Sequence, residues 1–145
     1  MHDLDGVQAR SEAAGVRGWM CCGSAEDDWD AVETLTHRAP QTAVSFGLHP
    51  LYLNRRSADW RVALRQRLER TASGVGEIGL DGTVEDESVS DQEAIFEEQY
   101  ALSIEMARPV SIHCRKAWKT LLDLLPRFGR HPVGFVVHAY SGAAE

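Results

Sequence analysis

The stretch SGVGEIGLDG, Ser73–Gly82, is a nearly continuous apolar and glycine-rich run that contains two acids, Glu77 and Asp81. Continuous rather than alternating hydrophobicity is typical of a β-strand that is covered on both faces, as in a parallel sheet. An unpaired carboxylate is costly to bury in such a strand. The stretch therefore predicts a buried strand, and it raises the question of what partners Glu77.

Four further runs of the same character are Val16–Cys22, Thr42–Leu48, Arg108–Cys114 and His131–His138. The intervening segments carry apolar residues at helical spacing. These stripes are Trp60, Leu64 and Leu68; Ile95, Leu102 and Met106; and Trp118, Leu121, Leu122, Leu125 and Phe128. Ser24 is predicted to cap the helix that follows the first strand. Strands that alternate with helices predict an α/β fold with parallel strands, either an open doubly wound sheet or a (β/α) barrel.

The composition limits the classes of function. The chain has 145 residues, the size of one domain, and a formal net charge of −7. Affinity for phosphate backbones comes mainly from Lys and Arg, so any attraction to nucleic acid must be local or carried by a metal. Cys21, Cys22 and Cys114 are too few and wrongly spaced for a disulfide framework or a zinc ribbon. Reduced thiols, with no signal peptide or membrane span in the sequence, predict a cytoplasmic protein.

Ionisable residues gather where the predicted strands end. His49 follows the second strand, Glu77 and Asp81 lie in the third, His113 closes the fourth and His138 closes the fifth. A lone histidine at a strand end is more often a satisfied core or surface residue, but four consecutive strands that share one rim favour a site. Imidazole and carboxylate suit a divalent cation. Coordination would neutralise Glu77, which could bridge two metals about 3.5–4 Å apart; the alternative is a salt bridge to a rim arginine.

Five motifs occur in the order of one family: GLHP, GEIGLD, the set Gln92, Phe96 and Gln99, PVSIHCR, and VVHAYSG. With these motifs the chain resembles the TatD-type metal-dependent deoxyribonucleases, which are amidohydrolase-like TIM barrels. The resemblance implies hydrolysis of DNA phosphodiesters by a metal-activated water, and several members are 3′ to 5′ exonucleases. It also implies divalent cofactors, Mg²⁺, Mn²⁺ or Zn²⁺, two of them in the intact family.

Carried over by position, the resemblance implies a role for each rim residue. Glu77 is the catalytic carboxylate shared by two metals, and His113 and His138 complete the coordination of one of them. His49 and Arg115 approach the substrate phosphate. The substrate class is DNA or a small phosphoester.

The sequence also departs from the family pattern. The H-x-H motif of the family's first strand and its C-terminal Asp have no counterpart, and a full (β/α)₈ barrel takes about 250 residues. Residues 1–145 are therefore expected to form one incomplete domain, a partial barrel of about five parallel strands, with impaired activity and exposed edges open to self-association. Two alternatives remain: a non-catalytic barrel fragment that needs a partner chain, or an amidohydrolase-like enzyme for a small ester or phosphoester. Arg55 and Arg56, after GLHP, are either phosphate contacts or solvated.

Overall fold

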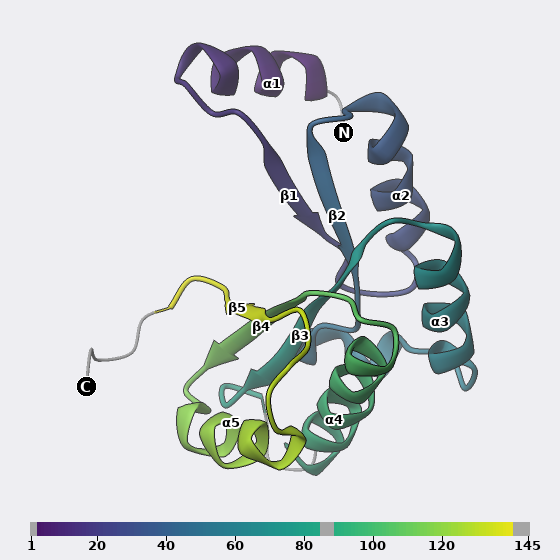
Figure 1. Ribbon diagram of the computed structural model, residues 1–145, viewed down its shortest axis with the longest axis vertical. Helices are drawn as coiled ribbons and strands as arrows, with labels where there is room; N and C mark the ends of the chain where they lie inside the picture. The colour runs from purple at the N-terminus through teal and green to yellow at the C-terminus, as the bar shows by residue number, and fades with distance from the viewer. Residues whose placement is uncertain (1–2, 85–88, 141–145) are drawn as a thin grey trace.

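The computed structural model describes residues 3–84 and 89–140. Its elements are α1 (Leu4–Ala13), β1 (Trp19–Cys22), α2 (Trp29–Arg38), β2 (Thr42–Phe46), η1 (Pro50–Arg55), α3 (Trp60–Arg70), β3 (Gly74–Asp81), α4 (Val89–Glu105), β4 (Val110–Arg115), α5 (Trp118–Leu124), η3 (Leu125–Phe128) and β5 (Phe135–Val137). The strands form one parallel sheet in the order β1-β2-β3-β4-β5. Figure 1 shows this sheet curled into a half-barrel with helices on its outer side. The predicted partial barrel is confirmed.

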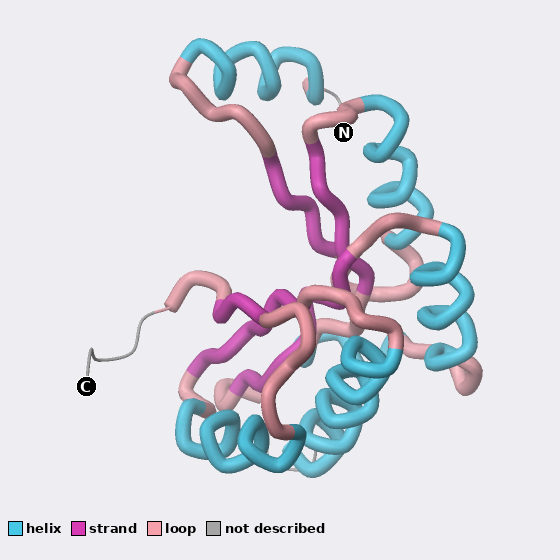
Figure 2. The backbone as a smooth tube through the Cα atoms, viewed as in Figure 1, coloured by secondary structure: helices cyan, strands magenta, loops and turns pink. Residues whose placement is uncertain are grey.

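The core lies between the sheet and the helices that cover it. Figure 2 shows these helices along the convex face of the sheet. The predicted stripe of α3 is confirmed, because Trp60, Leu64 and Leu68 are all buried. In α5 the predicted stripe is wrong at one position, since Leu122 is 64% exposed. The helix has only seven residues before the chain tightens into η3, and its buried positions are Leu121 and Leu124.

Two local predictions are wrong for identifiable reasons. Ser24 does not cap α2, which begins at Trp29; instead the backbone N–H and hydroxyl of Ser24 donate to the carboxylate of Asp28. Strand β5 is shorter than His131–His138, because Nδ1 of His131 accepts the N–H groups of Val133 and Gly134, at 3.2 and 2.8 Å. These bonds hold the segment before Phe135 in a bend rather than in the ladder.

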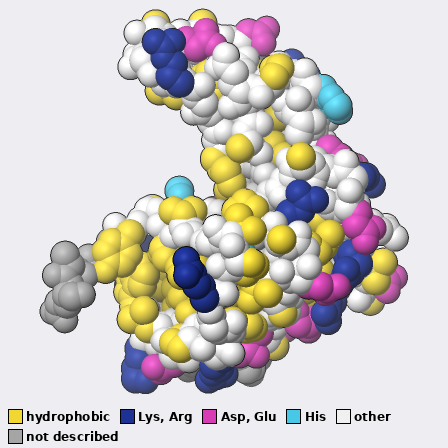
Figure 3. Space-filling view, viewed as in Figure 1, with side chains coloured by type: hydrophobic (Ala, Val, Ile, Leu, Met, Phe, Trp, Pro, Cys, Tyr) yellow, Lys and Arg dark blue, Asp and Glu magenta, His cyan; other side chains and the backbone are white. Residues whose placement is uncertain are grey.

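The half-barrel leaves its two outer strands and its concave side open among the described residues. Met20 on β1 and Phe135 and Val136 on β5 are 53%, 46% and 57% exposed. Figure 3 shows a deep hollow on this side with apolar side chains along it, and a cavity of about 400 Å³ is lined by Met20 and the start of β5. The described helices include none with the length and apolar character needed to span a membrane.

Candidate metal centre

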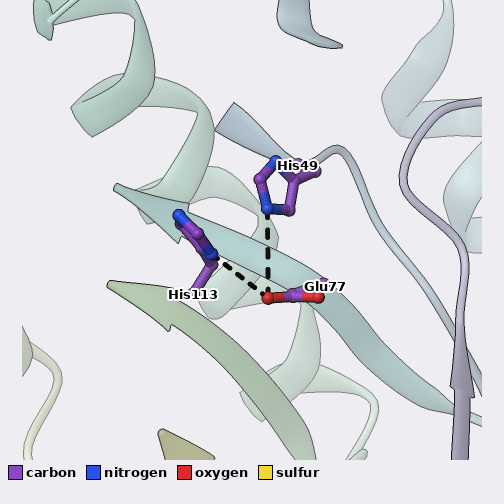
Figure 4. A group of neighbouring side chains, drawn as sticks. All are labelled: His49, Glu77 and His113. Carbon is purple, nitrogen blue, oxygen red and sulfur yellow. Dashed lines mark ion pairs between the residues drawn. The ribbon is translucent and has the colours of Figure 1, made fainter. Parts of the chain in front are cut away.

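Three of the predicted rim residues converge at the C-terminal side of the sheet. His49 comes from the loop after β2, Glu77 from β3 and His113 from β4. Nε2 of His49 lies 3.9 Å from Oε1 of Glu77, and Nδ1 of His113 lies 3.3 Å from the same oxygen. Figure 4 shows both imidazoles directed at this carboxylate. The potential ligand atoms of the three residues lie within 4.8 Å of one another.

The close approach of β3 to β4 depends on Gly79. This residue is the register partner of His113, and its φ of +149° is one that L side chains rarely adopt. A Cβ at position 79 would stand 1.9 Å from the carbonyl oxygen of His113. Glycine is therefore required here, because any side chain would push away the strand that carries the imidazole.

Asp81 fixes the orientation of His113. Its side chain is fully buried, and one carboxylate oxygen accepts a hydrogen bond from Nε2 of His113 at 3.0 Å, while the other accepts from Thr83. An ionised carboxylate only accepts hydrogen bonds, so this network places a proton on Nε2. Nδ1, which faces Glu77, is then the nitrogen that can bind a cation. This carboxylate–histidine pair is the usual support of a metal-ligating imidazole.

The hydrogen bonds of His49 place its proton on the ring nitrogen that faces Glu77. Its side chain is buried, and Nδ1 accepts the backbone N–H of Leu51 at 3.2 Å. Burial, followed by the charge of His113, lowers the pKa of His49, so the ring is neutral and carries one proton. That proton is on Nε2, which faces Glu77. In this arrangement Nε2 of His49 presents a hydrogen-bond donor toward the carboxylate of Glu77.

The charges of the cluster favour a cation. The hydrogen bond from His113 lowers the pKa of Glu77, and hydrogen bonds to Glu77 and then to Asp81 raise the pKa of His113. Burial raises the pKa of Asp81, but hydrogen bonds from Thr83 and His113 outweigh it and leave the carboxyl acidic. Two carboxylates with lowered pKa values therefore surround one imidazole at this point. A divalent cation would offset their negative charge, so the donor set fits a metal.

The remaining predicted site residues lie outside this cluster. His138 directly follows β5, its backbone N–H donates to the carbonyl of Ile112 at 2.8 Å, and its side chain is exposed. It is near the cluster, because the pKa of Glu77, which the hydrogen bond from His113 lowers most, also responds to His138. Arg115 is exposed at the end of β4, opposite Asp81 in the register.

Both loop arginines of the GLHP segment have carboxylate partners. Arg55 forms an ion pair with Asp27 and stacks over the ring of Tyr52, with 5.4 Å to the centroid. Arg56 binds Asp91 at 2.8 Å. Each guanidinium is thus engaged with the protein itself.

Sequence reasoning placed Asp81 on the rim without a role, and it did not distinguish the two imidazoles by their protons. The signal that was available for Asp81 is its position four residues after Glu77 in the same strand, which places both acids on one face. Its partner, His113, comes from a different strand. No pattern of nearby residues in the sequence predicts the contact between Asp81 and His113.

A parallel α/β half-barrel with a carboxylate and imidazoles at the C-terminal side of its strands defines the class: a barrel protein with a group of side chains that could hold a metal ion. Within that class, the family model described as "TatD related DNase" matches residues 1–145, and the chain belongs to this family.

Curated relatives and a solved structure agree with this assignment. The chain is 31% identical over 150 residues to the 3′-5′ ssDNA/RNA exonuclease TatD of Yersinia pseudotuberculosis, covering 99% of the chain and 56% of the relative. It is 30% identical to the protein of the same name from Enterobacter lignolyticus, over 99% and 55%. The crystal structure of YJJV, a TatD homolog from Escherichia coli K12, superposes with a TM-score of 0.92 at 30% identity, covering 98% of this chain and 56% of that one. The chain spans about half the length of these relatives.

Proposed function

We propose that this chain carries the metal-binding and phosphate-binding part of a metal-dependent phosphodiesterase that acts on single-stranded nucleic acid from the 3′ end. The observation that carries the proposal is the array Asp81–His113–Glu77, which presents Nδ1 of His113 and a carboxylate to one point. The names of the related exonucleases support the substrate class. The proposed phosphodiesterase activity is that of the protein in which these residues form the site.

The proposed roles follow from the protonation of each group. Glu77 and His113 hold a divalent cation with His138, whose exposed side chain follows β5. His49 donates its Nε2 proton to a phosphate oxygen, and Arg115 adds positive charge at the same rim. A bound Mg²⁺, Mn²⁺ or Zn²⁺ would polarise the phosphodiester and lower the pKa of the attacking water. Asp81 keeps the Nε2 proton on His113 throughout.

The charge of the chain favours binding of the substrate by its end. A net charge of −7 repels a polyanion overall. Attraction then has to come from the cation and from the few donors around it, which contact one phosphate group. A terminal phosphodiester of a single strand meets this condition with less repulsion than the middle of a duplex.

Two further parts of the proposal concern location and assembly. We place the protein in the cytoplasm, and its three cysteines, Cys21, Cys22 and Cys114, support this because all are free thiols. We also propose self-association through the open strand edges. The exposed apolar side chains of Met20 and Phe135 on the outer strands support it.

The test is metal binding and hydrolysis with the Glu77→Gln variant. We expect the unaltered chain to bind Mn²⁺ in a titration and to shorten a 5′-labelled single-stranded oligonucleotide from its 3′ end slowly, and only when the metal is present. Glu77→Gln should abolish both, whereas the control Glu98→Gln, which removes a surface ion pair with Arg61, should change neither. Equal metal stoichiometry in Glu77→Gln, or equal hydrolysis in excess chelator, would contradict the proposal.

A further inference from the structure

We infer that Gln92 and Gln99 of α4 are positioning residues, each of which fixes the backbone that orients one imidazole of the metal centre. Each glutamine makes a pair of hydrogen bonds to the backbone of one residue, and we call each pair a clamp. The inference rests on the proposed function for its consequence, because it assigns the clamp at Gln92 to metal binding and the clamp at Gln99 to phosphate binding. The geometric part stands on the contacts of the two amides alone.

The need for such residues arises from a gap in the sheet. Strands β2 and β3 share only two register pairs, Ser45↔Gly74 and Phe46↔Val75. In the described part of the chain no register pair between the two strands follows these, although Leu48 and Asp81 are still 1% exposed. Their backbone N–H and C=O groups have no β2–β3 ladder to join, and buried backbone groups of this kind require partners.

Gln99 supplies the partners for Leu48. Its Oε1 accepts the N–H of Leu48 at 2.7 Å, and its Nε2 donates to the C=O of the same residue at 3.2 Å. These two bonds hold the Leu48 backbone on both sides, and Leu48 immediately precedes His49. The next N–H along the chain, that of His49, donates to the carbonyl of Ser24 at 2.9 Å. The direction in which the His49 ring leaves the backbone is thereby set.

Gln92 makes the same pair of bonds to Asp81. Its Oε1 accepts the N–H of Asp81 at 2.8 Å, and its Nε2 donates to the Asp81 carbonyl at 3.3 Å. The carboxylate of Asp81 in turn holds Nε2 of His113. The chain of contacts runs from the amide of Gln92 through the backbone of Asp81 to the imidazole that faces Glu77.

One helix delivers both amides. Gln92, Phe96 and Gln99 are spaced i, i+4 and i+7, which places them on one face of α4. All three are buried, at 2%, 1% and 1% exposure, and Figure 1 shows α4 lying along β3. Phe96 lies between the two glutamines along this face and belongs to the hydrophobic core, so an apolar residue separates the two polar ones. A shift of α4 would move both imidazoles together.

The experiment compares Gln92→Met with Gln99→Met, because methionine has nearly the length of glutamine but neither donates nor accepts these bonds. A matched control is Ser103→Ala, which removes a buried hydrogen bond of the same helix to His131, at 3.0 Å, far from the cluster. Mn²⁺ affinity is measured by titration, inorganic phosphate affinity on the Mn²⁺-loaded chain, and imidazole ¹⁵N chemical shifts on the metal-free chain.

We expect a crossed result. Gln92→Met should weaken Mn²⁺ binding about 10-fold or more, as loss of support behind a ligand does, and should shift the ¹⁵N signals of His113. Gln99→Met should leave Mn²⁺ affinity within about 2-fold, weaken phosphate binding about 10-fold, and shift the ¹⁵N signals of His49. The control should lower the melting temperature, as both variants do, without any of these changes.

Equal effects of the two variants on both ligands, or unchanged imidazole signals in folded variants, would overturn the inference. If the unaltered chain binds no Mn²⁺, the proposed function fails, and the ¹⁵N shifts of the metal-free variants still decide whether the clamps position the rings. Should a methionine variant not fold, Gln92→Glu and Gln99→Glu replace it. They keep the oxygen that accepts the backbone N–H and lose the amide donor, so the same crossed pattern is expected at smaller amplitude.

Discussion

Replacing Asp81 by asparagine tests whether the Asp81 carboxylate decides which nitrogen of His113 carries the proton. The replacement exchanges one carboxylate oxygen for an NH₂ group. The Asp81 carboxylate accepts a 3.0 Å hydrogen bond from Nε2 of His113, and it is fully buried, so no water can take its place. In Asp81→Asn, one orientation of the amide still accepts from Thr83 but turns its NH₂ group toward Nε2. Two donors then face each other, and His113 relieves the conflict by moving its proton to Nδ1, the nitrogen that faces Glu77.

The expected cost follows from that proton. With Nδ1 protonated, a cation must first restore the disfavoured tautomer, and losses of this kind weaken metal binding about 10- to 100-fold. This corresponds to about 1.4–2.8 kcal/mol of binding free energy. The amide still fills the same volume, so the fold is retained, although the loss of a charge-assisted hydrogen bond lowers the stability by about 1.5–3 kcal/mol.

The assay combines a Mn²⁺ titration with long-range ¹H–¹⁵N spectra of the imidazoles. Asp91→Asn is the matched control, because it makes the same replacement in a carboxylate that pairs with Arg56 at 2.8 Å rather than with a histidine. The reasoning is refuted if Asp81→Asn binds Mn²⁺ as tightly as the unaltered chain, or if His113 keeps its proton on Nε2 in the variant.

Three further outcomes are expected. Mn²⁺ affinity should fall as the pH is lowered through the raised pKa of His113, above its ordinary value near 6.5, because the protonated ring has no free Nδ1; titrations at several pH values that show constant affinity would contradict this. Hydrogen bonding to Arg70 lowers the pKa of Glu33 to about 2 from 4.5, so the stability it provides is complete above pH 4.5 and is lost as the pH falls toward 2. After solvent screening this is about 1–2 kcal/mol, and acid unfolding of Glu33→Gln should lack that component. Gly79→Ala should cost about 3 kcal/mol or more in urea unfolding, since its Cβ would stand 1.9 Å from the His113 carbonyl oxygen; a stable variant would show that β3 and β4 can separate there.

Much of the fold was predictable because it depends on local patterns. The run that ends at Asp81 has the continuous hydrophobicity of a strand covered on both sides, and the stripe of Trp60, Leu64 and Leu68 has the period of a helix. The errors fall where a side chain overrides the pattern. His131 takes two backbone N–H groups out of the expected fifth strand, and Asp28 rather than Ser24 stands at the start of α2.

The sequence by itself determined which residues reach the rim. Strand ends in a parallel α/β fold share one edge, so His49, Glu77 and His113 had to be neighbours once the strands were identified. The roles carried over for all five rim residues, Glu77, His49, His113, His138 and Arg115, stay predictions, and the cluster formed in the structure contains neither His138 nor Arg115.

Only the tertiary structure decided which nitrogen of each imidazole carries the proton. That choice depends on the atom across from the ring: a carboxylate of a neighbouring strand for His113, and a backbone N–H for His49. It also depends on Gln92 and Gln99, which hold the backbone from a helix that follows the His49 segment and precedes the strand of His113. Hydrogen-bond direction is fixed by contacts across many residues, and spacing along one chain does not encode it.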